Sequence, residues 1–182
     1  LLFNFSLSNP VLDHPSNGQE LNYIHVLFEW VQEPNSELYN LQISTSESFN
    51  NIILNIFEES TIHIEKNILT WENTYFWRVK TISENGNHSE WSEISYFIIG
   101  EPISDSLSVD IYHNDMIEDG LIIYHLGIPR KSVVIDKIGN EVWNTEEFSF
   151  RHIDDFGRLF GGKIVNVAKM LSLERCKSVH IL

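Results

Sequence analysis

The chain has 182 residues, of which 42% are hydrophobic and 12% aromatic, and its formal net charge is −14. This length suits one or two ordinary domains, and the apolar content argues against a disordered chain. Residues 1–100 hold 13 acids and 3 bases, and residues 101–182 hold 13 acids and 9 bases. Neither half offers the basic face that neutralises phosphate, so nucleic acid and anionic membrane surfaces are disfavoured as partners.

Cys176 is the only cysteine, so no intrachain disulfide can form and a disulfide-stapled miniature fold is excluded. A sandwich of this size does not need disulfides, and we expect a secreted or cell-surface location. No run approaches 18 consecutive apolar residues, so no membrane insertion is expected. The chain opens with an apolar stretch and no Met, which is either the end of a signal peptide or a first strand. We expect a fragment or a processed product.

The first hundred residues contain short apolar runs separated by turn clusters, at the spacing of an all-β sandwich. Within the last of these clusters, Asn85-Gly86 predicts a tight hairpin because both residue types tolerate positive φ. No window shows sustained helical periodicity before residue 160. Strands are predicted at Tyr23–Trp30, Leu38–Ser44, Ile52–Phe57, Ile62–Ile64, Thr74–Ile82 and Ile94–Ile99.

An ordered set of motifs in this region carries a more specific signal. The motifs are Pro15-Ser16-Asn17-Gly18, Phe28-Glu29-Trp30, the run from Tyr39 to Thr45, Phe49, Ile52, Leu69 with Tyr75 after it, and Glu90-Trp91-Ser92. Together they cover nearly all of residues 9–100 and resemble fibronectin type III domains, in the form common in large secreted bacterial proteins. The resemblance implies a β-sandwich over residues 1–100.

Period-two alternation assigns the two faces of the predicted strand Thr74–Ile82. One face is predicted to carry Tyr75, Trp77 and Val79, and the other Phe76, Arg78 and Lys80. We expect Trp77 and Trp30 to supply two aromatic plates to the core between the sheets. No residue of the sandwich has the setting of a catalytic group.

Two further aromatic residues have predicted structural roles. Tyr75 stands where a tyrosine corner is expected, with its hydroxyl bonded to the backbone near Leu69. Trp91 is predicted to lie outside the core, where it either stacks on Arg78 as a cation–π pair or covers the sheet edge.

Residues 101–119 are predicted to form an acidic linker, since they contain Pro and no Lys or Arg. Its carboxylates could ligate calcium through oxygen, but they lack the spacing of a calcium-binding loop, so a solvated linker is preferred. They are Asp105, Asp110, Asp115, Glu118 and Asp119.

From Gly120 the pattern is β again. Two turns, Asp136-x-x-Gly139 and Asp154-x-x-Gly157, place Asp first and Gly fourth, which predicts two hairpins of one small antiparallel sheet. The predicted strands of residues 120–182 are Leu121–Leu126, Ser132–Asp136, Glu141–Asn144 and Phe148–Ile153, with Leu159-Phe160 after the second turn.

The segments Asp119 to Tyr124, Ser132 to Trp143 and Asp155 to Phe160 resemble the opening blade of an arylsulfotransferase-like β-propeller. A propeller needs about four to eight blades, and this chain holds one at most. The catalytic histidines of that family belong to later blades, so none is assigned here. The stretch from Val165 to His180 departs from the pattern and is predicted to be a short amphipathic helix or sequence foreign to the blade.

The remaining candidates for chemistry are isolated. None of the eight histidines has metal-ligand spacing, and His113 between Asp110 and Asp115 is the nearest approach to a metal site. Cys176 between Arg175 and Lys177 is expected to be a passive thiol. We therefore expect no catalytic, cofactor-binding or metal site in this chain.

Three hypotheses about function follow. The first is a non-catalytic extracellular or cell-surface binding or spacer module, a fragment of a larger secreted protein with a protein or carbohydrate partner. The second is the N-terminal accessory part of an arylsulfotransferase-like propeller enzyme, whose catalytic residues lie outside the chain. The third gives residues 120–160 weak self-association through open sheet edges.

Overall fold

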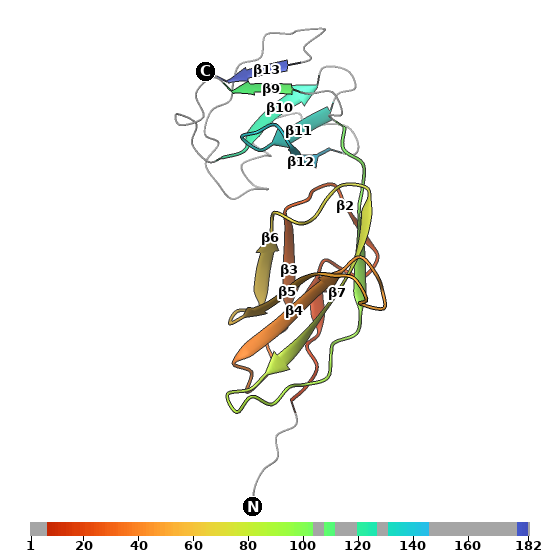
Figure 1. Ribbon diagram of the computed structural model, residues 1–182, viewed down its shortest axis with the longest axis vertical. Helices are drawn as coiled ribbons and strands as arrows, with labels where there is room; N and C mark the ends of the chain where they lie inside the picture. The colour runs from red at the N-terminus through yellow and green to blue at the C-terminus, as the bar shows by residue number, and fades with distance from the viewer. Residues whose placement is uncertain (1–6, 104–107, 112–119, 127–130, 146–177, 182) are drawn as a thin grey trace, which may run out of the picture. The chain divides into compact units, whose positions relative to one another are not determined.

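The computed structural model describes residues 7–103, 108–111, 120–126, 131–145 and 178–181. The chain divides into two compact units, Leu1–Gly100 and Glu101–Leu182, and each unit has its own sheets (Figure 1). All regular structure in the described residues is β. Across those residues, no helix has the length and apolar character to cross a membrane.

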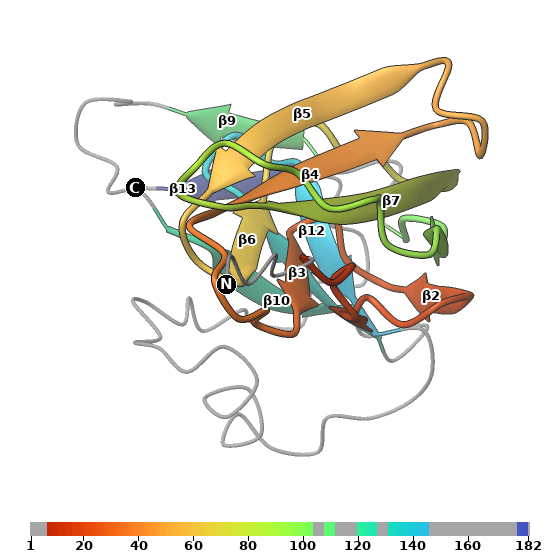
Figure 2. The ribbon, with the colours of Figure 1, turned by 90° about the horizontal axis from the view of Figure 1, so that it is seen from below.

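The first unit is a sandwich of two sheets. A three-stranded sheet has the order β1-β3-β6, and a five-stranded sheet has the order β2-β8-β7-β4-β5. Figure 2 shows β7, β4 and β5 of the larger sheet side by side. Neighbouring strands are antiparallel except β2 and β8, which are parallel. The strands are β1 Leu12–His14, β2 Gln19–Leu21, β3 Val26–Trp30, β4 Leu38–Ser44, β5 Ile52–Glu58, β6 Ile62–Glu65, β7 Asn73–Ile82 and β8 Ser95–Ile99.

This arrangement confirms the predicted all-β sandwich. The strand from Leu38 to Ser44 begins and ends where the sequence predicts, and the other predicted strands of this unit differ by a few residues at their ends. β1 and β2 were not predicted. Each has three residues, too few to show alternation.

The core lies between the sheets because alternate residues of each strand point inward. Val26, Phe28 and Trp30 of β3 are buried, as predicted for Trp30, and the buried positions of β7 include Tyr75 and Trp77. The Phe28 ring packs edge-on against Trp77, with ring centroids 5.2 Å apart, and thereby joins the two sheets.

The two tryptophans both lie in the core, as predicted, and each packs against a different ring. Trp30 packs edge-on against Tyr39, with ring centroids 5.5 Å apart, whereas Trp77 packs against Phe28. Neither buried indole N–H has a hydrogen-bond acceptor among the described residues. Shape complementarity of the rings, rather than polar bonding, therefore fixes their positions.

The turn predicted after β7 is present, but only one residue of its Asn85-Gly86 pair has positive φ. The Gly86 N–H donates to the Ser83 carbonyl at 2.8 Å, and Gly86 alone of the Asn85-Gly86 pair has positive φ, at 75°. The N–H of Ser83 donates to the carbonyl of Asn87 at 2.9 Å. This is a three-residue loop, in which a glycine in the left-handed region follows a tight turn.

Tyr75 forms the predicted corner. Its hydroxyl accepts a 3.0 Å hydrogen bond from the N–H of Thr70, one residue beyond Leu69, and lies 3.2 Å from the Thr70 hydroxyl. The Tyr75 ring is buried and stacks on Phe97, with centroids 5.6 Å apart. The loop before β7 is therefore bonded to a core residue.

The second unit contains an antiparallel sheet of order β10-β11-β12 and a parallel pair of β9 with β13. The β11–β12 turn confirms the first predicted Asp-x-x-Gly hairpin: Asp136 Oδ1 accepts from the N–H groups of Ile138 and Asn140, and Gly139 has φ 95°. The strands are β9 Ser108–Ile111, β10 Ile122–Leu126, β11 Lys131–Ile135, β12 Glu141–Asn144 and β13 Ser178–Ile181.

Two predictions for this unit differ from the structure. β9 lies inside the predicted linker, and β13 lies at the end of the tail that was predicted to be a short amphipathic helix or sequence foreign to the blade. Pairing between β9 and β13, which are far apart in sequence, gives both segments an extended conformation that local composition does not reveal. The predicted strands Phe148–Ile153 and Leu159-Phe160, and the second hairpin at Asp154, lie outside the described residues.

The tyrosine corner yields the first prediction. Tyr75→Phe removes the hydroxyl of a buried residue that accepts the Thr70 N–H, and we expect the free energy of unfolding to fall by about 1–2 kcal/mol. Urea denaturation followed by tryptophan fluorescence measures the change. Tyr96→Phe, at a residue 38% exposed, is the matched control and should change stability by less than about 0.5 kcal/mol. Equal effects of the two substitutions would contradict the role given to Tyr75.

Candidate functional site

The residues singled out from the sequence do not assemble into one site. Asp105, Asp115, Glu118, Asp119, His113 and Cys176 lie outside the described residues, and Asp110 lies in β9 with its side chain undescribed. In the parts of the chain that the structure describes, no group of three or more His, Cys, Asp or Glu side chains could hold a metal ion.

Chemistry-bearing side chains instead gather on the outward face of the five-stranded sheet. The guanidinium carbon of Arg78 lies 3.9 Å from the ring centroid of Phe49 and 4.1 Å from that of Trp91. The Lys80 ammonium lies 4.7 Å from the Trp91 centroid. The predicted stacking of Trp91 on Arg78 is therefore confirmed, and a second cation and a second ring join it.

Arg78 also begins a row of amide hydrogen bonds across this face. Its Nε and Nη2 donate to Gln42 Oε1 at 3.0 and 2.8 Å, and Gln42 Nε2 donates to Asn55 Oδ1 at 3.4 Å. Asn40 Nδ2 donates to the same Asn55 oxygen at 2.7 Å and to the Ile56 carbonyl at 2.9 Å. Burial lowers the pKa of Arg78, but a guanidinium remains charged at any physiological pH.

The segment that carries Trp91 is fastened to β7 by two serine hydroxyls. The Val79 N–H donates to Ser92 Oγ at 3.1 Å, and the Thr81 N–H donates to Ser89 Oγ at 3.0 Å. Each hydroxyl takes the place of a strand carbonyl. Trp91 is therefore held over Arg78 by the residues on either side of it.

Phe49 reaches the same cluster from an unusual backbone conformation. Its φ is 56°, in the left-handed region that costs an L-residue with a bulky side chain roughly 1–2 kcal/mol. The turn around it is closed by a 2.9 Å bond from the Phe49 N–H to the Ser46 carbonyl. The buried ring and its contact with Arg78 offset this cost.

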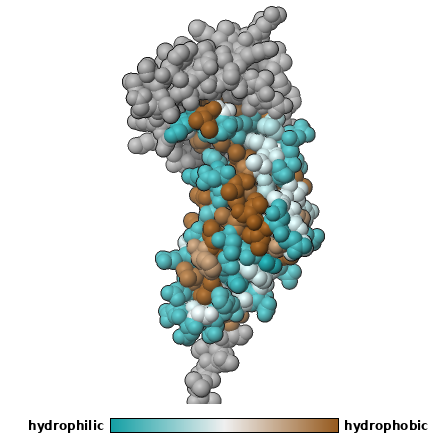
Figure 3. All heavy atoms as spheres, in the orientation of Figure 1, coloured by the Kyte–Doolittle hydropathy of each residue, from teal (hydrophilic) through white to brown (hydrophobic). Residues whose placement is uncertain are grey.

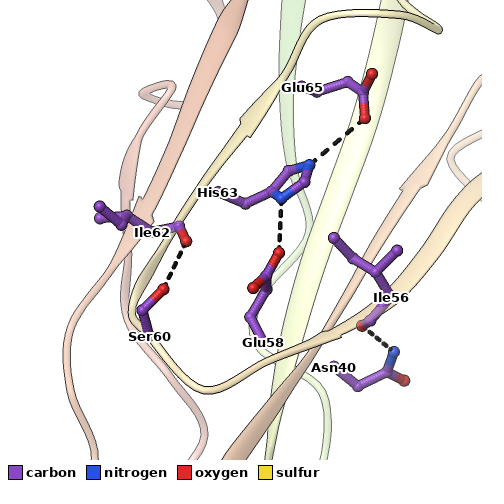
Figure 4. Close-up of polar contacts among 7 residues, drawn as sticks. All are labelled: Asn40, Ile56, Glu58, Ser60, Ile62, His63 and Glu65. Carbon is purple, nitrogen blue, oxygen red and sulfur yellow. Dashed lines mark hydrogen bonds and ion pairs between the residues drawn. The ribbon is translucent and has the colours of Figure 1, made fainter.

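A second polar cluster joins β5 to β6 (Figure 4). His63 Nδ1 lies 2.7 Å from Glu58 Oε1, and His63 Nε2 lies 3.5 Å from Glu65 Oε2. Glu65 Oε1 accepts from the N–H groups of Asn67 and Ile68 at 2.6 and 3.2 Å. Burial raises the pKa of Glu65, but these N–H donors together with His63 bring it below its ordinary value.

Sequence reasoning missed this cluster, because Ile62 and Ile64 look like the buried positions of β6. In the structure they are 47% and 52% exposed, and His63 and Glu65 point inward. The available signal was the loop after β6, whose backbone N–H groups need an acceptor. The carboxylates are committed to the fold, so the cluster closes a sheet edge and does not present an acid–base pair to a substrate.

In the second unit the buried carboxylate of Glu141 also accepts hydrogen bonds from a neighbouring segment. Both oxygens of Glu141 lie 3.1 Å from the Ile103 N–H, and Asn144 Nδ2 donates to Glu141 Oε1 at 2.6 Å. Asn144 also donates to the Glu101 carbonyl at 3.1 Å. These bonds fix the segment 101–103 against β12.

Residues 16–101 match the family described as "Rha78A-like, N-terminal immunoglobulin domain". Together with the two-sheet topology, this match makes the first unit an immunoglobulin- or fibronectin type III-like domain, as the sequence predicted. No curated protein matches the chain.

Several solved structures are similar to part of this chain. The Streptomyces avermitilis alpha-L-rhamnosidase complexed with L-rhamnose is 18% identical with a TM-score of 0.42, over 52% of this chain and 10% of that one. The Dictyoglumus thermophilum alpha-L-rhamnosidase is 12% identical with a TM-score of 0.43, over 72% and 16%. A Fn3-like protein from Clostridium thermocellum is 21% identical with a TM-score of 0.35, over 53% and 91%. This chain thus spans only a small part of either rhamnosidase.

The contacts of Arg78 and Lys80 predict that Arg78 contributes more to the free energy of unfolding than Lys80 does. Arg78→Lys keeps the charge but loses the forked pair of bonds to Gln42 Oε1, so we expect the free energy of unfolding to fall by about 1–2 kcal/mol. Lys80→Met removes only the contact with Trp91 and should cost less than about 1 kcal/mol. Urea denaturation measures both. If Arg78→Lys lowered stability no more than Lys80→Met, the role given to the two bonds from Arg78 to Gln42 would be contradicted.

Glu65 predicts a pH dependence of stability. Because its folded-state pKa is lowered, its stabilising contribution is complete above the ordinary value of 4.5 and is lost as the pH falls through the folded-state pKa. Glu65→Gln keeps the acceptor oxygen but not the charge, and should lower the free energy of unfolding by about 1 kcal/mol at neutral pH. The difference from the unmodified chain should shrink below pH 4.5, as measured by urea denaturation at a series of pH values. A stability difference between the Glu65→Gln variant and the original chain that did not change with pH would exclude this role of the Glu65 charge.

Proposed function

We propose that this chain is a non-catalytic accessory module of a longer carbohydrate-active protein, a glycoside hydrolase of the Rha78A-like kind. The observation that carries the proposal is the family match over residues 16–101, which describes a domain found at the N-terminus of such proteins. The catalytic residues would lie outside this chain, in keeping with the sequence, which offers no catalytic constellation. Secretion or display at the cell surface is part of the proposal.

The chemistry of the described surface favours a spacer or stabilising module over a sugar-binding one. A sugar site needs convergent polar groups beside an aromatic ring. On the outward face of the five-stranded sheet, the polar groups of Arg78, Gln42 and Asn40 already bond to one another or to Asn55. The ring of Trp91 is already covered by Arg78 and Lys80.

The alternative is the accessory part of an arylsulfotransferase-like propeller enzyme. The observation that favours it is the β10-β11-β12 meander with its Asp136 turn, since a propeller blade is an antiparallel meander of four strands. Its sheet edges are also the place for the weak self-association of residues 120–160 suggested by the sequence.

The proposal predicts where activity resides. The purified chain should release no p-nitrophenol from p-nitrophenyl α-L-rhamnoside, whereas the longer product of its gene should do so. Deleting residues 1–100 from that product should lower its melting temperature and leave kcat unchanged, because the module supplies no catalytic group. Absorbance assays and calorimetry measure these quantities. Rhamnoside hydrolysis by the chain alone would overturn the proposal, and sulfuryl transfer from p-nitrophenyl sulfate by the longer product would favour the propeller alternative.

A further inference from the structure

The edges of the two sheets in the first unit are protected to very different degrees. An edge strand presents unpaired N–H and C=O groups, and proteins blunt such edges with short strands, proline, irregular pairing or inward-pointing charges. Within the described residues, the edge strands are β1, β6, β2 and β5.

Three of these edges carry a recognisable protection. β1 and β2 have three residues each, and β1 has irregular register against β3 and is followed by Pro15. β6 turns His63 and Glu65 inward, where they bond to Glu58 and to the following loop. These devices leave little backbone available for a further strand.

β5 carries such protection only at its two ends, in a register shift against β4 near Ile52 and in the Glu58 carboxylate beside His63, and its middle has none. It has seven residues, Ile52–Glu58, with no Pro, Gly or Lys and a single charged residue at its end. Among the described strands it pairs only with β4, in regular register from Leu54 to Glu58, and it lies at the rim of the sheet in Figure 2. A neutral run of β-branched and aromatic residues is the composition that pairs most readily with another strand.

The side chains of β5 are also incompletely covered. Phe57 is 59% exposed and Ile52 is 41% exposed, while Leu54 and Ile56 pack only partly against the core. Figure 3 shows apolar side chains at the surface over the middle of the first unit. A strand laid beside β5 would extend the sheet and cover these residues.

We propose that β5 is an interaction edge whose occupant is the β5 strand of a second copy of this chain, paired antiparallel about Asn55. Across such a pair Leu54 of one copy lies opposite Ile56 of the other. The acidic end at Glu58 then faces the Ile52 end of the other strand.

The local charge pattern suits this occupant. Glu59, whose carboxylate only accepts hydrogen bonds, follows the strand, and Asn50, whose amide can donate, precedes it, whereas Glu58 and Asn51 already bond to His63 and Thr45. An antiparallel pair sets Glu59 of each copy near the Asn50-Asn51 segment of the other and brings no like charges face to face. The net charge of −14 opposes the approach of two copies, so salt that screens it should strengthen the pairing.

Sedimentation of the whole chain from about 1 μM to about 1 mM tests the proposal. We expect a monomer–dimer equilibrium that strengthens with added salt, and amide hydrogen exchange at residues 52–58 that slows with concentration while exchange at residues 62–65 does not. Phe57→Lys should raise the dissociation constant at least tenfold. Ile64→Lys, at a residue 52% exposed on the protected edge, is the matched control and should leave it within about twofold.

The charge change makes the comparison sharp, because an added lysine lowers the net negative charge and by itself would promote association. Circular dichroism checks that both variants remain folded. A chain that stays monomeric throughout the concentration range overturns the proposal and leaves the edge to a partner of different sequence. A dimer that survives Phe57→Lys, or that Ile64→Lys weakens equally, overturns it as well and directs attention to residues 120–160.

Discussion

Phe28 reaches from the three-stranded sheet of the first unit to the five-stranded sheet, where its ring packs edge-on against Trp77 and Phe97. All three rings are completely buried. Because aromatic rings bury large areas and prefer this geometry, the contact sets how the two sheets face each other. The same alternation of buried and exposed positions turns Tyr75 into the core and brings the Trp30 ring against Tyr39.

The outward face of the five-stranded sheet shows how a surface can be polar and still unsuited to a ligand. Arg78 bonds to Gln42 and lies over two aromatic rings, so its charge and its donors are already used within the fold. Phe49 adopts a left-handed backbone conformation, with φ 56°, and its ring lies against Arg78. A rigid, internally satisfied face suits a module that separates or supports its neighbours.

The two edges formed by β5 and β6 follow one another in the chain, yet they have opposite character. On β6, His63 and Glu65 point inward and the isoleucines point outward, and this costs little because backbone N–H groups satisfy the Glu65 carboxylate. β5 packs Leu54 and Ile56 partly against the core, exposes Phe57 and has an unpaired edge among the described strands. Both edges lie within the sandwich that the sequence predicts, but only the three-dimensional structure distinguishes them.

The sequence by itself determined the sandwich, the faces of β7, the corner at Tyr75 and the Asp136 turn, and it left two positions open for Trp91. These features depend on period-two alternation, on strands of regular spacing or on turn chemistry within a few residues. The tertiary structure alone decided the parallel pairing of β2 with β8, the ring contacts of Phe28, the pairing of β9 with β13 and the inward face of β6. Alternation shows that the two faces of a strand differ. At a short edge strand such as β6, however, the face that is buried depends on whether other segments supply hydrogen-bond partners for its side chains.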